Sequence, residues 1–417
     1  MTAADGYYDA LETRDPEARE AALMAALPEQ VALAKRRASA YSALLADIEP
    51  EAVTSRAALA RLPVTRKSDL PGQQAESPPF GGFASVAPGE MHRIFASPGP
   101  IYDPEGRGPG GQDYWRTARA LWATGFRAGD VVHNCFSYHF TPAGAMFETG
   151  AHAIGCAVVP AGVGNPELQA KAIAQLRPRG YVGTPDFLKI ILEKADELGL
   201  DCGTLNIAHV SGGPYLPQHR DSYEAREIAV FQSYGTADIG AIAYESPARE
   251  GLVVDEGAIV EIVRPGTGDP VPEGEVGEVV VTAFSREYPL LRFATGDLSA
   301  VLAGPSACGR TNMRIKGWMG RADQTTKVKG MFVHPSQIAE VLRRHPDAAK
   351  ARLTVDSRDG GDAMTLAVEA AAPKPGLAEA IAATLQAVTK LRGTVELAAP
   401  GALPNDGNVL DDIRRYD

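Results

Sequence analysis

The sequence predicts an α/β protein with two domains. A large N-terminal domain (1–322) is expected to combine layered, mostly parallel sheets with a β-rich subdomain, and a small, mobile α+β domain (323–417) follows a hinge near Asp323. Three observations lead to this prediction. Short apolar runs alternate with helical stretches from about 115 to 235, as in a parallel sheet covered by helices. Glycine-punctuated β-rich segments follow, which are typical of an antiparallel or barrel-like subdomain. The remaining chain alternates helix and strand as a separate unit.

The first 90 residues are predicted to be helical. Asp15 can cap a helix that has Pro16 at its first position and an acid in its first turn. A second helix is predicted to carry Val31, Ala34, Ala38, Tyr41 and Leu45 on one apolar face, because these residues are spaced three or four positions apart.

The predicted strands of the parallel sheet are VVHNCF, CAVVP, GYVGT, IAHVSG and IAVFQSYG, with helices over 166–176 and 186–199 between them. The β-rich region comprises GAIVEIVRPG, GEVGEVVVTAF and LLRFATGDLSAVL. In the C-terminal domain, a helix over 335–345 leads to a hairpin of KARLTVDS and AMTLAVEA, and a helix over 376–391 precedes the strand TVELA.

Charge and composition exclude several classes of protein. The 417 residues carry 41 basic and 52 acidic side chains, a net charge of −11, so nucleic acid and anionic membrane surfaces are not expected partners. No apolar stretch approaches the ~20 residues of a membrane helix, and the acidic N-terminus does not resemble a secretory signal. The four cysteines form no CxxC pair, as expected of an enzyme in the reducing cytoplasm.

Four segments carry recognisable motifs: YPLLRFATGD at 288–297, RIKG through KGMFV at 314–333, QSYGTAD at 232–238 and LPVTRKSDL at 62–70. The first three resemble the "PLIRYRTGDL", domain-hinge and "YGxTE" signatures of the adenylate-forming (acyl-CoA synthetase) superfamily. The fourth resembles the "LPxTxKxDL" entry segment of its phenylacetate–CoA ligase branch. The resemblance runs in order over essentially the whole chain.

The resemblance implies a nucleotide site. Asp297 is expected to accept hydrogen bonds from both ribose hydroxyls, with Arg321 as a fixed cation near the ribose or phosphates. Asp238 takes the position of a glutamate that helps to hold magnesium at the phosphates. Tyr234 has a ring that can stack on adenine. The other expected cofactor contacts are Ser97, Gly99, Ser211, Gly212, Gly213, Pro214, Ser233, Gly235 and Thr236.

Two segments depart from the family pattern. Relatives carry a Ser/Thr/Gly-rich phosphate loop ending in lysine, whereas residues 95–102 read FASPGPIY, where two prolines remove two amide donors. Asn408 stands where relatives place a lysine that neutralises charge during adenylation. Either adenylation is impaired, or another lysine replaces it; Lys67, Lys327 and Lys329 are the candidates, and Lys327 is included with Asp238, Arg321 and Asn408 among the predicted catalytic residues.

No zinc is predicted. Some members of the branch carry a structural zinc site of Cys and His, but the matching stretch Glu245–Val253 contains neither, and Ser306-Ala307-Cys308 keeps a single thiol. Zinc requires about four ligands.

The resemblance implies a pocket for the acid between the central sheet and the 133–147 region. Phe136, Tyr138, His139 and Phe140 bring three aromatic rings and an imidazole close together there. An aryl acid would gain from stacking on these rings, although each ring taken singly is more often a core residue. His139 is a candidate contact for a carboxylate or a structural histidine.

The resemblance predicts an AMP-forming acid–CoA ligase that uses ATP, Mg²⁺ and CoA, with an arylacetic or benzoic acid as substrate. An acyl-adenylate forms first, the C-terminal domain then rotates, and CoA attacks to give a thioester. Two alternatives stay open. The chain could be a nucleotide- or acyl-CoA-binding homologue with impaired adenylation, or it could serve a separate carrier protein. A homodimer is suggested by analogy with relatives.

Overall fold

The computed structural model describes residues 6–107, 112–213, 215–322, 326–329, 331–358, 361–404, 406 and 408–414. The chain divides into two compact units. The first comprises Met1–Val260, Val281–Phe293 and Leu302–Gly317, and the second comprises Glu261–Val280, Ala294–Val301 and Trp318–Asp417.

The N-terminal segment is helical, as predicted. It contains α1 (Pro16–Arg37), α2 (Ser39–Leu44), α3 (Arg56–Leu59) and α4 (Leu70–Glu76). Asp15 caps α1, because its Oδ1 accepts a hydrogen bond from the Ala18 amide at 2.9 Å. The prediction that one separate helix carries Val31 through Leu45 is wrong, since α1 already contains Val31 and the chain is extended at Ala38 before α2 begins. The predicted apolar positions are nevertheless all buried, because one extended residue breaks the helix without exposing that face.

A nine-stranded sheet forms the centre of the first unit, in the order β14-β15-β10-β9-β8-β7-β6-β4-β5. The predicted parallel strands β4–β8 are confirmed, whereas β9, β10 and β15 continue the sheet with each strand antiparallel to the one before it. The strands are β4 (Val131–Asn134), β5 (Ala157–Pro160), β6 (Gly180–Gly183), β7 (Ile207–Val210), β8 (Ala229–Thr236), β9 (Gly240–Glu245), β10 (Leu252–Val254), β14 (Val301–Leu302) and β15 (Arg314–Ile315).

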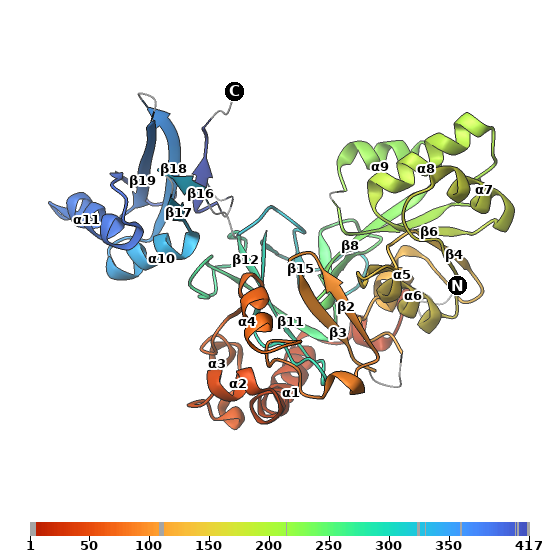
Figure 1. Cartoon of the computed structure of the whole chain (residues 1–417), viewed down its shortest axis with the longest axis horizontal. Coiled ribbons are helices and arrows are strands. Elements are labelled where there is room, and N and C mark those ends of the chain that lie inside the picture. Colours follow the sequence, from red (N-terminus) through yellow and green to blue (C-terminus); the bar gives the residue numbers. More distant parts are fainter. Residues whose placement is uncertain are drawn as a thin grey trace. The chain divides into compact units, whose positions relative to one another are not determined.

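Helices cover both faces of the parallel strands (Figure 1). On one side lie α5 (Ala118–Thr124) and α6 (Ala143–Ile154), and on the other lie α7 (Pro166–Leu176), α8 (Pro185–Leu198) and α9 (Pro217–Glu224). Aromatic residues fill the α5–α6 side, including Trp115, Phe126 and Phe147. Crossover helices on both faces leave the strand ends and the loops after them to form a site.

The predicted β-rich region forms a four-stranded sheet in the order β1-β13-β12-β11. Its strands are β1 (Thr65–Arg66), β11 (Ala258–Val263), β12 (Gly277–Ala283) and β13 (Phe293–Ser299). A separate hairpin pairs β2 (Arg93–Ser97) with β3 (Ile101–Glu105).

The C-terminal part of the second unit has the predicted helices and hairpin. β18 and β19 pair antiparallel over their whole length, in a sheet ordered β20-β19-β18-β21. The elements are β16 (Thr326–Val328), β17 (Met331–Val333), α10 (Pro335–Arg344), β18 (Lys350–Arg358), β19 (Gly361–Glu369), α11 (Leu377–Thr389), β20 (Thr394–Ala398) and β21 (Leu410–Asp412). The predicted hinge residue Asp323 lies outside the described residues, so the boundary stays a prediction.

No helix within the described ranges is both long and apolar enough to cross a membrane.

Candidate nucleotide and acid site

The segment expected to be the phosphate loop is a tight hairpin. Ser97 at the end of β2 pairs with Ile101 at the start of β3, so Gly99 lies in the turn. The side chain of Gln74 in α4 makes two hydrogen bonds to β3. Its Nε2 donates to the Tyr102 carbonyl at 2.9 Å, and its Oε1 accepts from the Tyr102 backbone amide at 2.8 Å. On the other strand, the Ala96 amide donates to the Phe140 carbonyl at 2.9 Å. Strand pairing and these bonds occupy backbone groups that a phosphate-binding loop would offer to the nucleotide.

Two of the predicted motifs meet in an ion pair. Asp238 lies in the turn between β8 and β9 with a buried side chain, and its Oδ2 is 2.5 Å from Nζ of Lys67. Asp103 of β3 lies beside this pair. Burial and, after it, the charge of Asp238 together raise the pKa of the Asp103 carboxyl to about 8, against smaller opposing effects of the Ser97 hydroxyl and the Lys67 charge. The entry segment and the "YGxTE"-like segment therefore join at a cluster of two carboxyl groups and one ammonium.

The carboxyl ends of β7 and β8 bring together the other residues of the predicted nucleotide site. Ser211 donates from Oγ to the Ser233 carbonyl at 2.9 Å, and Ser233 Oγ is 2.8 Å from Nε2 of His209. Burial lowers the pKa of His209 to about 3, so this imidazole is neutral and orients the serine. Gly212 and Gly213 follow as exposed residues, whereas Pro214 lies outside the described residues.

The β8–β9 turn has a specific backbone requirement. A Cβ on Gly235 would lie 2.5 Å from the Gly240 carbonyl oxygen, so glycine is required for the two strands to approach at this bulge. Thr236 Oγ1 accepts from the Ile239 amide at 3.2 Å, which fixes the turn that carries Asp238. Tyr234 is partly exposed on β8, as a ring that stacks on a base must be.

The second unit contains the residues that were predicted to bind the ribose. Asp297 of β13 and Arg321 form a backbone bridge, and Arg321 Nη1 is 3.0 Å from Asp297 Oδ1. The sequence analysis missed Trp318, whose indole Nε1 donates to the same oxygen at 3.0 Å although its ring is largely exposed. An aromatic residue two positions before Gly320 of the Gly-Arg motif was the signal that could have indicated it.

The aromatic segment divides into a buried and an exposed part. Phe136 is buried and stacks on Phe147 with ring centroids 4.9 Å apart, so it belongs to the core of the α5–α6 side. Tyr138 is half-buried and its hydroxyl accepts from Asn134 Nδ2 at 2.8 Å. His139 and Phe140 are exposed with their rings edge to face, and the Phe140 backbone is held by β2.

Asn408 lies in the second unit, beside a small pocket that Arg264, Val276 and Leu342 also line. Its backbone N–H donates to Asp406 Oδ1 at 3.0 Å. Arg352 anchors the segment through ion pairs with Asp406 and Asp411. The side chain of Lys327 lies outside the described residues.

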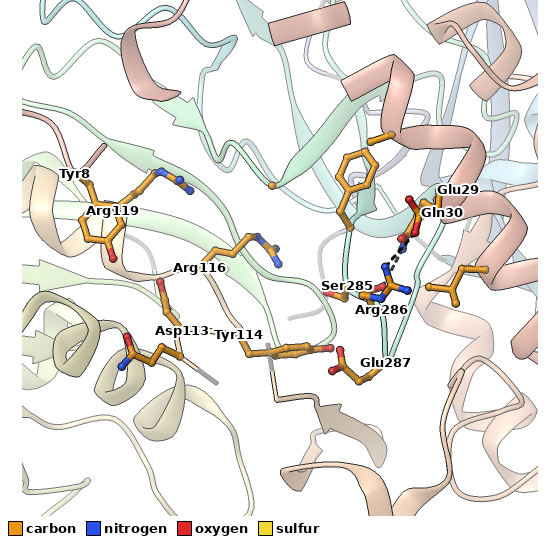
Figure 2. Close-up of a pocket in the computed structure, with 15 residues that line it drawn as sticks. Tyr8, Glu29, Gln30, Asp113, Tyr114, Arg116, Arg119, Ser285, Arg286 and Glu287 are labelled. Atoms are coloured by element: carbon orange, nitrogen blue, oxygen red, sulfur yellow. Dashed lines mark hydrogen bonds and ion pairs between the residues drawn. The ribbon is translucent and has the colours of Figure 1, made fainter. Parts of the chain in front are cut away.

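The first unit also contains a cavity of about 690 Å³ (Figure 2). None of the predicted site residues lines it; its walls are Tyr8, α1, the segment 112–119, Gly257 and the loop 284–287. Figure 2 shows Arg286 joined to Glu29 on one side of the cavity, at 3.1 Å. Arg116 and Arg119, on the other side, both pair with Asp255. Because these arginines already have carboxylate partners, the cavity is poorly suited to a polyphosphate.

Known proteins match the chain over most of its length. Residues 112–284 match the AMP-binding enzyme family, and residues 330–411 match the AMP-binding enzyme C-terminal domain. A phenylacetate-coenzyme A ligase of Thermus thermophilus is 31% identical over 382 residues, which are 88% of this chain and 85% of that protein. The chain belongs to the phenylacetate–CoA ligase family. A second member, from Aromatoleum evansii, is 32% identical over 335 residues, 77% of this chain and 74% of its own.

The solved structures agree with this fold. A 2-hydroxyisobutyryl-CoA ligase in an open conformation, in complex with 2-HIB-AMP and CoA, has a TM-score of 0.71 at 24% identity, and the match covers 94% of this chain and 91% of that one. The sequence-based prediction of family and fold is confirmed, as is the enzyme class it implied, an AMP-forming acid–thiol ligase.

The carboxyl groups of Asp238 and Asp103 suit a magnesium ion. Mg²⁺ prefers oxygen ligands and is usually held by one or two carboxylates together with water. Asp238 Oδ1 is buried and has no hydrogen-bond partner among the described residues, and the same is true of both carboxyl oxygens of Asp103. When bound, the ion would neutralise charge on the phosphates.

At the position of the family's zinc site, serines surround one thiol. Cys308 Sγ is 3.2 Å from the hydroxyls of both Ser246 and Ser306. No group of three or more potential metal ligands from His, Cys, Asp and Glu occurs within the part of the chain that the structure describes, and the absence of zinc stays a prediction.

We expect Cys308 to react as a thiolate near neutral pH. Burial raises its pKa, but hydrogen bonds from Ser246, Ser306 and Arg310 outweigh this and lower it to about 7. Iodoacetamide labelling followed by peptide mass spectrometry should show a rate for Cys308 that rises with pH to a midpoint near 7. Cys202, whose pKa burial raises, is the internal control and should label only under more alkaline conditions. Equal profiles for the two thiols would contradict the prediction.

Proposed function

We propose that the chain is an AMP-forming acid–CoA ligase that activates an aryl carboxylic acid through an acyl-adenylate and transfers it to CoA. The ion pair between Lys67 and Asp238 carries this proposal, because it joins two family segments 171 residues apart at the end of the central strands. A cation and a carboxylate held together there are the groups that a metal-bound triphosphate requires.

Several residues of the family motifs are proposed to contact the nucleotide. The Asp297 carboxylate, held by Arg321 and Trp318, accepts the ribose hydroxyls. Tyr234 stacks on the base, and the Ser211–Gly213 turn lines it. Asp238 holds magnesium, and Lys67 is released from Asp238 to neutralise phosphate charge. Each of these roles is assigned by the position of the residue in a family motif.

The acid is bound by the aromatic segment. Exposed Phe140 and half-buried Tyr138 offer ring faces, and offset stacking on an aryl substrate contributes about 0.5–1.5 kcal/mol beyond burial. His139 lies next to Phe140 and is the contact for the carboxylate. The relatives named for phenylacetate support an arylacetic acid as the first substrate to test.

Mass spectrometry of CoA thioesters tests the proposal. The full chain is incubated with ATP, Mg²⁺, CoA and a pool of aryl and short aliphatic acids, and we expect a thioester of an aryl acid together with AMP. A parallel reaction replaces CoA by hydroxylamine, which traps an acyl-adenylate whatever its natural acceptor. Omitting ATP is the control.

The two readouts separate the alternatives. A hydroxamate without a CoA thioester would indicate a separate carrier protein as acceptor. Binding of ATP or CoA with neither product would favour the binding homologue with impaired adenylation, to which the hairpin at the phosphate-loop position lends support.

Location and assembly belong to the same proposal. We place the ligase in the cytoplasm, where its four free cysteines would stay reduced. A homodimer is proposed only by analogy with relatives.

A further inference from the structure

A group of buried oxygen atoms lies where the β2–β3 hairpin meets the turn after β8. Asp103 is completely buried, and neither of its carboxyl oxygens has a hydrogen-bond partner among the described residues. Within the same ranges, Ser97 Oγ, Asp238 Oδ1 and the Tyr288 hydroxyl also lack one. Ser97 and Asp238 lie near enough to Asp103 to act on its charge. Buried polar atoms in proteins are normally satisfied, so this group of oxygens indicates a ligand.

The hairpin register explains how these side chains converge. Asp103 pairs with Phe95, and Ser97 pairs with Ile101. Paired residues of antiparallel strands share a face, as do residues two apart along a strand. Ser97 and Asp103 therefore project from the same face of the hairpin, toward Asp238.

The charges of the group balance only when a further positive charge is present. Lys67 contacts Asp238 Oδ2 and also acts on Asp103 from a greater distance. With both carboxyl groups ionised, the one ammonium would leave one negative charge in a buried position. An unpaired buried charge is strongly unfavourable, so either a proton or a second cation completes the group.

We propose that Asp103, Asp238 and Ser97 form a divalent-cation site that is complete without nucleotide. Three oxygen-bearing side chains suit Mg²⁺, which keeps several waters, better than Ca²⁺, which takes six to eight oxygen ligands. In this nucleotide-free state, Lys67 stays on the second oxygen of Asp238. Asp103 is the new element, because the hairpin supplies a carboxylate where the family has a phosphate loop. The site would serve the proposed ligase reaction, but its test needs neither ATP nor acid.

Titration of Mn²⁺ into the nucleotide-free full chain, followed by the electron paramagnetic resonance signal of free Mn²⁺, tests the site. We expect one saturable site from which Mg²⁺ displaces Mn²⁺. The isosteric Asp103→Asn variant should weaken binding by about tenfold or more, because changes even to supporting residues of metal sites cost 10–100-fold. Ser97→Ala should weaken binding less.

Glu105→Gln is the matched control. Glu105 lies on the same strand and face as Asp103 and is also buried, but its carboxylate pairs with Arg93 at 2.6 Å. Its removal should leave Mn²⁺ affinity unchanged. Circular dichroism establishes whether each variant is folded. If Asp103→Asn does not fold, the Mn²⁺ affinity of Ser97→Ala tests the proposal instead.

Two results would overturn the proposal: no saturable Mn²⁺ binding by the unmodified chain, or equal affinity in the Asp103→Asn, Ser97→Ala and unmodified proteins. Either would mean that a proton shared between the carboxyl groups completes the cluster. Mn²⁺ binding that depends on Asp103, in a protein that makes neither hydroxamate nor thioester, would support the cation site while the proposed function failed.

Discussion

The Asn408→Lys variant is expected to form acyl-adenylate about 10²–10³-fold faster than the unmodified chain, because one group that stabilises transition-state charge commonly contributes that factor. The unmodified side chain is a neutral amide, and its Nδ2 is 3.3 Å from Asp406 Oδ2. A lysine would supply the positive charge that the family motif has at this position. Single-turnover formation of hydroxamate from acid, ATP and hydroxylamine measures the step directly.

Asn408→Gln is the control for side-chain length, and it should leave the rate unchanged. The thioester-forming half-reaction, started from synthetic acyl-adenylate and CoA, should respond little to either variant. If Asn408→Lys has no effect, another lysine supplies the charge. Lys67→Met would then abolish adenylation in both backgrounds, which identifies Lys67 as the substitute.

The Asp297→Ala variant is expected to raise the KM for ATP about 10²-fold or more. A carboxylate that accepts from two ribose hydroxyls makes two charge-assisted hydrogen bonds, each contributing about 1.5–3 kcal/mol. The KM for the acid should change much less, because the acid reacts at the α-phosphate and not at the ribose hydroxyls. Initial rates over a matrix of ATP and acid concentrations separate the two constants.

Trp318→Phe tests whether the hydrogen bond from Trp318 helps the Asp297 carboxylate to bind ATP. It keeps the ring but removes the indole N–H that donates to Asp297 Oδ1, so we expect a several-fold rise in the KM for ATP, consistent with the loss of about 1 kcal/mol. An unchanged KM for ATP in Asp297→Ala would mean that this aspartate only caps its turn.

The sequence was sufficient for the elements whose residues carry a local signal. Helix α7 was predicted with its observed bounds, and the structure shows the local signal that fixes its start, since Pro166 opens it after Asn165, whose side chain caps it. The break at Ala38 was missed, because the apolar spacing continues through it and periodicity cannot detect a single extended residue.

Long-range contacts limited the prediction of the site. Motif positions indicated Asp238, Asp297 and Arg321 residue by residue. The role of Asp103 could not be predicted, because it depends on a hairpin register and on a turn 135 residues away, and an Asp-Pro dipeptide in a strand carries no family signal. The core position of Phe136 likewise depends on its contact with Phe147.

The hairpin anchored by Gln74 and by the Phe140 carbonyl has a thermodynamic consequence for nucleotide binding. A flexible glycine-rich loop gains many amide contacts with phosphate but loses conformational entropy when it closes. This hairpin offers fewer donors, yet its backbone is already ordered before any ligand arrives, so little entropy remains to be lost. Affinity for the triphosphate should therefore rest on fixed side-chain charges and the metal ion, and should depend more on ionic strength than on loop closure.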